Sequence, residues 1–184
     1  TYSRLLAGAM AVMLTAGAVC TPQVVWAAKT VASETKTESI KRVTVHDPSF
    51  VKDRETGTYY VFGSHMATAK SDDLVNWTQI AKDYEFPLAG KDDPVYGNVV
   101  ENFAESFRWA GYNDGDCATT DSKLAVWAPD VFWDDAYEWA DGTKGAYLMY
   151  YTASSTWKRS CIGVAVSKTI EGPYAHLDTL VYSG

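Results

Sequence analysis

Hydrophobic and polar residues alternate in several short runs between residues 43 and 81, which is the pattern of half-buried β-strands. Aromatic and β-branched residues dominate these runs, and Gly57 suits the positive φ of a hairpin turn. A second turn, over residues 72–77, is expected to bury Leu74 and Trp77. The expected strands cover residues 43–51, 58–64, 67–71 and 78–81. Four short antiparallel strands in succession are the unit of a β-propeller blade.

The same order of elements returns later in the chain. An inner strand is expected at residues 130–134 and a turn at 141–145, followed by strands at 146–154 and 161–167. Residues 165–170 also match residues 69–74 in pattern. Internal repeats of this kind are typical of propellers. We therefore expect an all-β protein in which residues 43–184 form about the first two blades of a β-propeller, with further blades after Gly184.

The stretch from about Tyr84 to Lys123 has no clean period and is rich in Gly, Asp and Asn. A connection of this length inside a domain is usually functional. We expect an elaborated loop over the propeller face, with a short helix near residues 100–109.

The start of the chain is typical of a secretory signal peptide. One arginine precedes an uncharged apolar run over residues 5–19, which is too short for an ordinary membrane span. We expect residues 1–28 to be removed by cleavage near Ala27 or Ala28, so that the protein is secreted and has no membrane association afterwards. Residues 29–42 are polar and are expected to be a disordered leader.

The cysteines leave two questions open. Cys20 would allow a lipoprotein anchor, although Val19 before it is large for that signal. After signal removal Cys117 and Cys161 remain, and two cysteines in a secreted chain suggest one disulfide. Two separate buried thiols are the alternative.

The composition limits the classes of partner that this protein is expected to bind. The net charge of −7 argues against nucleic acid or an anionic membrane surface. The 7 Trp and 12 Tyr either build a β core or line a sugar site, because flat aromatic faces stack on sugar rings. No metal-binding spacing of His or Cys and no Gly-rich phosphate loop occurs, so no metal or cofactor is expected within this stretch.

Two acidic residues stand beside prolines where the inner strands begin. Asp47 lies in His46-Asp47-Pro48, and Asp130 lies in Ala128-Pro129-Asp130. Because every propeller blade sends its inner strand to a shared centre, both carboxylates are candidates for a central site. An ionised carboxylate within reach of water can act as a general base, whereas the alternative for each residue is a turn or strand-end role.

Five motifs follow one another along the chain: HDPS at 46–49, YYVFGSH at 59–65, SDDLVNW at 71–77, VWAPDV at 126–131 and EGPY at 171–174. Together they resemble the family 43 glycoside hydrolases, in particular the arabinan endo-1,5-α-L-arabinosidases. The resemblance implies a five-bladed β-propeller that hydrolyses O-glycosyl bonds of α-1,5-linked arabinan, a plant polysaccharide, with inversion. We expect this enzyme to be a monomer.

The resemblance makes Asp47 the general base. The family's second Asp and its general acid Glu lie on later blades and would fall beyond Gly184, so the 184-residue chain is expected to be inactive alone. In inverting glycosidases, acid and base are held about 6.5–9.5 Å apart, with a water between the base and the sugar. A Ca²⁺ near the centre of the full-length protein is also implied, with its protein ligand on a later blade.

Four further residues are candidates for contacts with the substrate. Asp130 is expected near the pocket, where it would support or contact the sugar, with a turn cap as the alternative. His46 and His65 are candidate hydrogen-bond donors to the sugar, and a structural role is the alternative for each. Trp127 is expected either to form a flat surface on which the sugar stacks or to pack in the core.

Other functions stay open on the sequence. A β-xylosidase or α-L-arabinofuranosidase would share the family and differ in the shape of the long loop. A non-catalytic carbohydrate-binding propeller is the alternative from another class. A fructan-acting propeller fits less well, because His46 stands where an Asn is usual.

Overall fold

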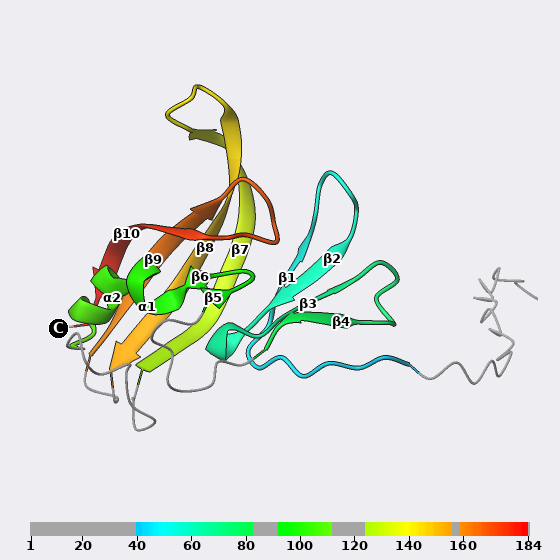
Figure 1. Ribbon diagram of the computed structural model, residues 1–184, viewed down its shortest axis with the longest axis horizontal. Helices are drawn as coiled ribbons and strands as arrows, with labels where there is room; N and C mark the ends of the chain where they lie inside the picture. The colour runs from blue at the N-terminus through cyan, green and yellow to red at the C-terminus, as the bar shows by residue number, and fades with distance from the viewer. Residues whose placement is uncertain (1–39, 83–91, 112–123, 156–158, 184) are drawn as a thin grey trace, which may run out of the picture. The chain divides into compact units, whose positions relative to one another are not determined.

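Two four-stranded antiparallel sheets carry the fold (Figure 1). The computed structural model describes residues 40–82, 92–111, 124–155 and 159–183, all within one compact unit over residues 38–184. Short helices and one two-stranded pair are the other regular elements of these residues. The expected all-β class is therefore confirmed. No helix in the described ranges is long and apolar enough to cross a membrane.

The first sheet is a meander of four strands in chain order. Its strands are β1 Ser49–Lys52, β2 Tyr59–Phe62, β3 Thr68–Ser71 and β4 Thr78–Ala81. The β1–β2 hairpin closes on the Asp53 carboxylate, which accepts hydrogen bonds from the backbone and hydroxyl of Thr56. All four strands were predicted, but β1 begins at Ser49 rather than residue 43. The backbone turns before it, where Asp47 has a φ of 46°.

The second sheet is also a meander in chain order. Its strands are β7 Leu124–Glu138, β8 Lys144–Ser155, β9 Arg159–Ser167 and β10 Ala175–Tyr182. The first three were predicted, although β7 is much longer than expected, with a β-bulge between Trp127 and Asp130. β10 was not predicted, because most of its side chains are exposed and its pairing with β9 is twice irregular.

The segment between the sheets adds short elements to one face of the second sheet. These are β5 Asp92–Asp93, β6 Gly97–Asn98, α1 Val99–Asn102 and α2 Ala104–Trp109. The Asn98 side chain caps α1 by accepting a hydrogen bond from the Glu101 N–H. α2 contacts β8, β9 and β10 (Figure 1). The helix expected near residues 100–109 is thus confirmed, whereas much of the surrounding loop lies outside the described residues.

Aromatic side chains form the core that joins the two sheets and the inserted segment. Phe62 of β2 meets Tyr174 edge to face, with ring centroids 6.1 Å apart. Phe103 lies 4.6 Å from Tyr151 of β8, again between centroids. All four rings are buried, and burial of such rings stabilises a core strongly. Much of the aromatic content therefore serves the core.

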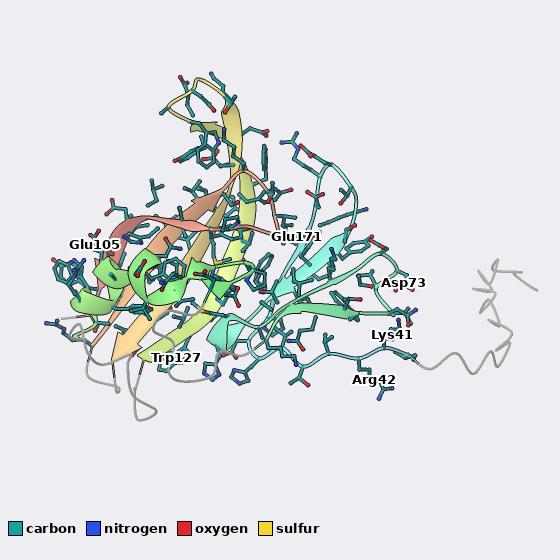
Figure 2. The ribbon with its side chains drawn as sticks, in the orientation of Figure 1. Lys41, Arg42, Asp73, Glu105, Trp127 and Glu171 are labelled. Carbon is teal, nitrogen blue, oxygen red and sulfur yellow. The ribbon has the colours of Figure 1, made fainter. Side chains whose placement is uncertain are left out.

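Polar contacts also brace the two sheets against each other. Glu171 accepts hydrogen bonds from the Tyr60 hydroxyl at 2.7 Å and from Lys70 Nζ at 2.6 Å (Figure 2). These bonds, that of Lys70 first, lower the pKa of Glu171. The Tyr147 hydroxyl of β8 donates a hydrogen bond to Asp53 in the first sheet. We call these residues the brace of the sheet interface.

The turn at residues 72–77 differs from its prediction. Leu74 is 47% exposed and has a φ of 64°. The Asp73 carboxylate accepts hydrogen bonds from the backbone N–H groups of Val75 and Asn76, so polar contacts close the turn. Bonds from the backbone and side chain of Asn76 lower the pKa of Asp73. The expected burial of Leu74 was therefore wrong.

One residue near the end of the expected leader contacts the first sheet. The Trp77 N–H donates a hydrogen bond to the Lys41 carbonyl oxygen at 3.0 Å, which ties this residue to the first sheet. Residues 29–39 of the leader, and the expected signal peptide over residues 1–28, lie outside the described residues.

The expected Cys117–Cys161 disulfide is not formed in this structure. Cys161 on β9 is a buried free thiol, and its Sγ lies 3.3 Å from the Ser106 carbonyl oxygen. It faces α2 inside the core, and burial raises the pKa of this thiol. Cys117 lies outside the described residues.

Candidate active site

A pocket of about 470 Å³ opens where the two sheets meet. Its lining comes from the segment before β1, the 3₁₀ turn η1 (Ser64–Met66), and strands β7 and β8. The lining residues are His46, Asp47, Ser64, His65, Trp127, Ala128 and Thr152. Contacts of β1 and η1 with β7 bring these distant segments together.

Asp47 is the only carboxylate that the described residues bring to this pocket. Its Oδ2 accepts a hydrogen bond from the Ser64 hydroxyl at 3.0 Å and lies 2.9 Å from His46 Nδ1. Its Oδ1 accepts no hydrogen bond within the described part of the chain. The Asp47 side chain is 53% exposed, so water can reach this carboxylate. This arrangement can accept a proton from a water molecule in the pocket.

Unusual backbone conformations gather around the pocket. Among the described residues, five non-glycine residues have positive φ, and three of them line it: Asp47 at 46°, His65 at 60° and Ala128 at 41°. Such conformations cost about 1–3 kcal/mol each and persist only where the surrounding structure enforces them. Their clustering supports a functional role for this end of the interface.

The rest of the pocket wall offers an aromatic face and a hydroxyl. Trp127 is half-buried near the start of β7 (Figure 2). Thr152 stands opposite it in the β7–β8 pairing, and its hydroxyl makes no hydrogen bond within the described residues. An indole face beside an available hydroxyl can hold a sugar ring by stacking and hydrogen bonding.

The structure brings four of the five predicted site residues together: Asp47, His46, His65 and Trp127 all line the pocket. Asp130 does not line it. This exposed residue accepts a hydrogen bond from the Ser49 hydroxyl at 2.6 Å, which ties β7 to β1 beside the pocket. Its expected contact with substrate stays a prediction.

Sequence reasoning missed three lining residues, Ser64, Ala128 and Thr152. Ser64 belongs to the YYVFGSH motif, but its contacts depend on tertiary structure. Thr152 lies in a strand whose alternation predicts only burial. Neither Ser64 nor Thr152 carries a local signal that would have identified it.

Metal binding has no support in the described residues. No group of three or more His, Cys, Asp or Glu side chains there could hold a metal ion. The Ca²⁺ that the sequence resemblance implies therefore has no ligand set in this part of the chain.

Comparisons with known proteins agree with the motifs. The chain is 39% identical over 145 residues to the extracellular endo-α-(1→5)-L-arabinanase 2 of Bacillus subtilis (strain 168), which covers 78% of this chain and 25% of that protein. It is also 39% identical over 141 residues to the extracellular endo-α-(1→5)-L-arabinanase of Thermotoga petrophila, covering 76% and 25%. The chain thus spans about a quarter of the length of these curated relatives. No family model matches the chain.

A solved structure extends the similarity to the fold. A family 43 glycoside hydrolase from Bacillus licheniformis matches with a TM-score of 0.58 and 41% identity, over 79% of this chain and 27% of that chain. The two meander sheets thus share the fold of the matched part of that protein. The resemblance to the family 43 glycoside hydrolases is confirmed by sequence and by fold.

Proposed function

We propose that this protein is a secreted glycoside hydrolase that cleaves α-1,5-linked arabinan, with Asp47 as its general base. The observation that carries the proposal is the state of the Asp47 carboxylate. It lines a pocket, its Oδ2 accepts a hydrogen bond from Ser64 and lies 2.9 Å from His46 Nδ1, and its Oδ1 accepts no hydrogen bond within the described residues. The identity of 39% to two arabinanases supports the substrate class.

The reaction follows from the requirements of a single displacement. Asp47 Oδ1 takes a proton from a water molecule while the water oxygen attacks the anomeric carbon. The bond from that carbon to the leaving oxygen breaks, and a general acid on the opposite side protonates the leaving oxygen. Attack opposite the leaving group inverts the anomeric configuration. The acid would be the Glu that the family resemblance places on a later blade.

The full-length gene product would complete the scaffold that this pocket needs. We propose a monomeric five-bladed β-propeller in which β1 and β7 are the inner strands of the first two blades. The two meander sheets support this arrangement, because each has the strand number and order of a blade. A central Ca²⁺ would take its ligands from the later blades.

The test is hydrolysis of linear α-1,5-arabinan by the full-length gene product. NMR of the first-formed sugar should show the anomeric configuration opposite to that of the substrate. Release of products from xylan or from aryl arabinofuranosides, with no action on arabinan, would instead favour the β-xylosidase or arabinofuranosidase function. Retention of configuration would contradict the role of Asp47 as a base.

A binding module is the second candidate function, and one observation favours it. Asp47 is the only carboxylate among the described residues of the pocket, whereas hydrolysis needs two. Calorimetric binding of arabino-oligosaccharides that are recovered intact would support this function and contradict the hydrolase proposal.

A further inference from the structure

Ser64 is a buried hydroxyl beside the candidate base. It is 1% exposed and belongs to the η1 turn that follows β2. A buried hydroxyl is unfavourable unless it is hydrogen bonded, so an apolar residue would be the simpler choice for packing alone. The contacts of Ser64 indicate why a hydroxyl is present.

Two hydrogen bonds fix the direction in which the Ser64 hydroxyl points. The Ala128 N–H of the second sheet donates to Ser64 Oγ at 2.9 Å. Ser64 Oγ in turn lies 3.0 Å from Asp47 Oδ2. Because an ionised carboxylate only accepts hydrogen bonds, the single hydroxyl proton of Ser64 points to Asp47. A chain of two bonds therefore runs from the second sheet to the base, and such chains strengthen each member.

The backbone around Ser64 is fitted to the same segment. The Ser64 N–H donates to the His46 carbonyl oxygen at 2.8 Å. A Cβ at Gly63 would lie 2.3 Å from Val45 Cγ1 and 2.5 Å from the His46 oxygen, so only glycine permits this approach. The turn thus packs directly against the segment that carries Asp47.

These contacts decide which oxygen of Asp47 is available. Ser64 and His46 both engage Oδ2, and the His46 side chain is 74% exposed, so its contact is the weaker constraint. We propose that Ser64 is a positioning residue that turns Oδ1 of Asp47 toward the attacking water, and that docking of the two sheets through Ala128 sets this orientation. The inference rests on the proposed role of Asp47 as base.

The test compares Ser64→Ala with Ser64→Thr in the full-length gene product on linear arabinan. Misplacing a reacting group by about 1 Å can cost about 100-fold in rate. We expect Ser64→Ala to lower kcat about 10- to 100-fold with KM unchanged within about twofold. Ser64→Thr keeps the hydroxyl and should recover most of kcat. If Ser64→Ala does not fold, Ser64→Cys offers a weaker donor of similar size and should give a smaller loss in kcat.

The matched control is Ser106→Ala. Ser106 is also buried, and its Oγ lies 2.9 Å from both the Tyr151 and Thr179 hydroxyls, away from the pocket. This substitution should lower the melting temperature and leave kcat within about twofold. A loss of kcat equal to that of Ser64→Ala would overturn the inference.

Two measurements separate this inference from the proposed function. In an Asp47→Ala background, Ser64→Ala should cause no further loss of rate, because the two residues act as one unit. Crystal structures of the wild type and Ser64→Ala should show one Asp47 carboxylate orientation in the former and a rotated or divided one in the latter. An unchanged carboxylate overturns the positioning role even if arabinan is hydrolysed. If the wild type does not cleave arabinan, the proposed function fails, and the crystal structures alone decide whether Ser64 orients Asp47.

Discussion

Two aspartates flank β1, and their surroundings are opposite. Asp53 follows the strand and is 6% exposed. Its Oδ2 accepts two hydrogen bonds from Thr56, and its Oδ1 accepts one from Tyr147. Burial alone would raise the pKa of Asp53, but these bonds outweigh it and lower the pKa. Asp47 precedes the strand, is half-exposed, and keeps one oxygen without a hydrogen bond in the described structure.

The difference distinguishes a structural carboxylate from one that can react. The bonds to Asp53 stabilise its ionised form inside the sheet interface, and both of its oxygens accept hydrogen bonds. Asp47 is held through contacts to one oxygen only within the described residues, and its side chain is 53% exposed. Substitutions at the two positions should therefore separate activity from stability.

The largest effect is expected for Asp47→Asn in the full-length gene product. Loss of a general base typically costs about 10²–10⁴-fold in rate, whereas an exposed side chain contributes little to folding. Steady-state kinetics on arabinan and a thermal melt measure both quantities. Activity above about a tenth of wild type would contradict the assignment of Asp47 as base.

Asp53→Ala should show the reverse pattern. It leaves the Tyr147 hydroxyl buried without its acceptor, and such a loss costs about 1–3 kcal/mol in the free energy of unfolding. Below the melting transition, kcat should stay within about twofold of wild type. Denaturant titration gives the stability. A kcat that falls as far as in Asp47→Asn would end the distinction between the two carboxylates.

The indoles at the two ends of the interface allow a parallel comparison. Trp127→Ala should raise KM about tenfold, because stacking on an aromatic face is worth on the order of 1 kcal/mol or more. Trp133 lies near the brace, with its ring 4.9 Å from that of Tyr147. Trp133→Ala should lower the melting temperature and leave KM unchanged. Equal KM changes in both variants would remove Trp127 from the substrate site.

Acidic pH should remove the contribution of Asp53, a residue of the brace, to the stability of the fold. The folded-state pKa of Asp53 lies below its ordinary value of 3.8, so its ionised form stabilises the fold. This contribution is complete above about pH 5 and is lost as the pH falls through the folded-state pKa. Asp53→Asn should therefore flatten the loss of stability between about pH 4 and pH 2, measured by denaturant titration. Curves that stay parallel would show that Asp53 does not contribute.

The smallest effect concerns Cys161. Its raised pKa and burial predict slow reaction with a thiol reagent in the native state and fast reaction after unfolding. Cys161→Ser identifies the signal that belongs to this residue. Mass spectrometry that finds Cys161 bridged to Cys117 would restore the disulfide predicted from the sequence.

Local patterns predicted the parts of this structure that depend on local interactions. β3 and β4 begin within one residue of their expected positions, since their turns are encoded in adjacent residues. The motifs likewise singled out Asp47 and Trp127, which both line the pocket. The hydrogen-bond chain through Ser64 could not be predicted, because its partners lie on different sheets. The predicted burial of Leu74 failed for a related reason. A hydrophobic side chain in a turn suggests burial, but hydrogen bonds to the neighbouring Asp73 close this turn without burying Leu74.

The bulge in β7 allows side chains on both sides of it to face the same core. Val126 and Val131 are an odd number of positions apart, which in a regular strand would place them on opposite faces. Both nevertheless lie in the same core cluster, because the extra residue at the bulge restores the alternation. Deleting one residue there would turn one half of the strand inside out relative to the other. Insertions and deletions should therefore be tolerated in the β7–β8 hairpin loop and not at Ala128 or Pro129.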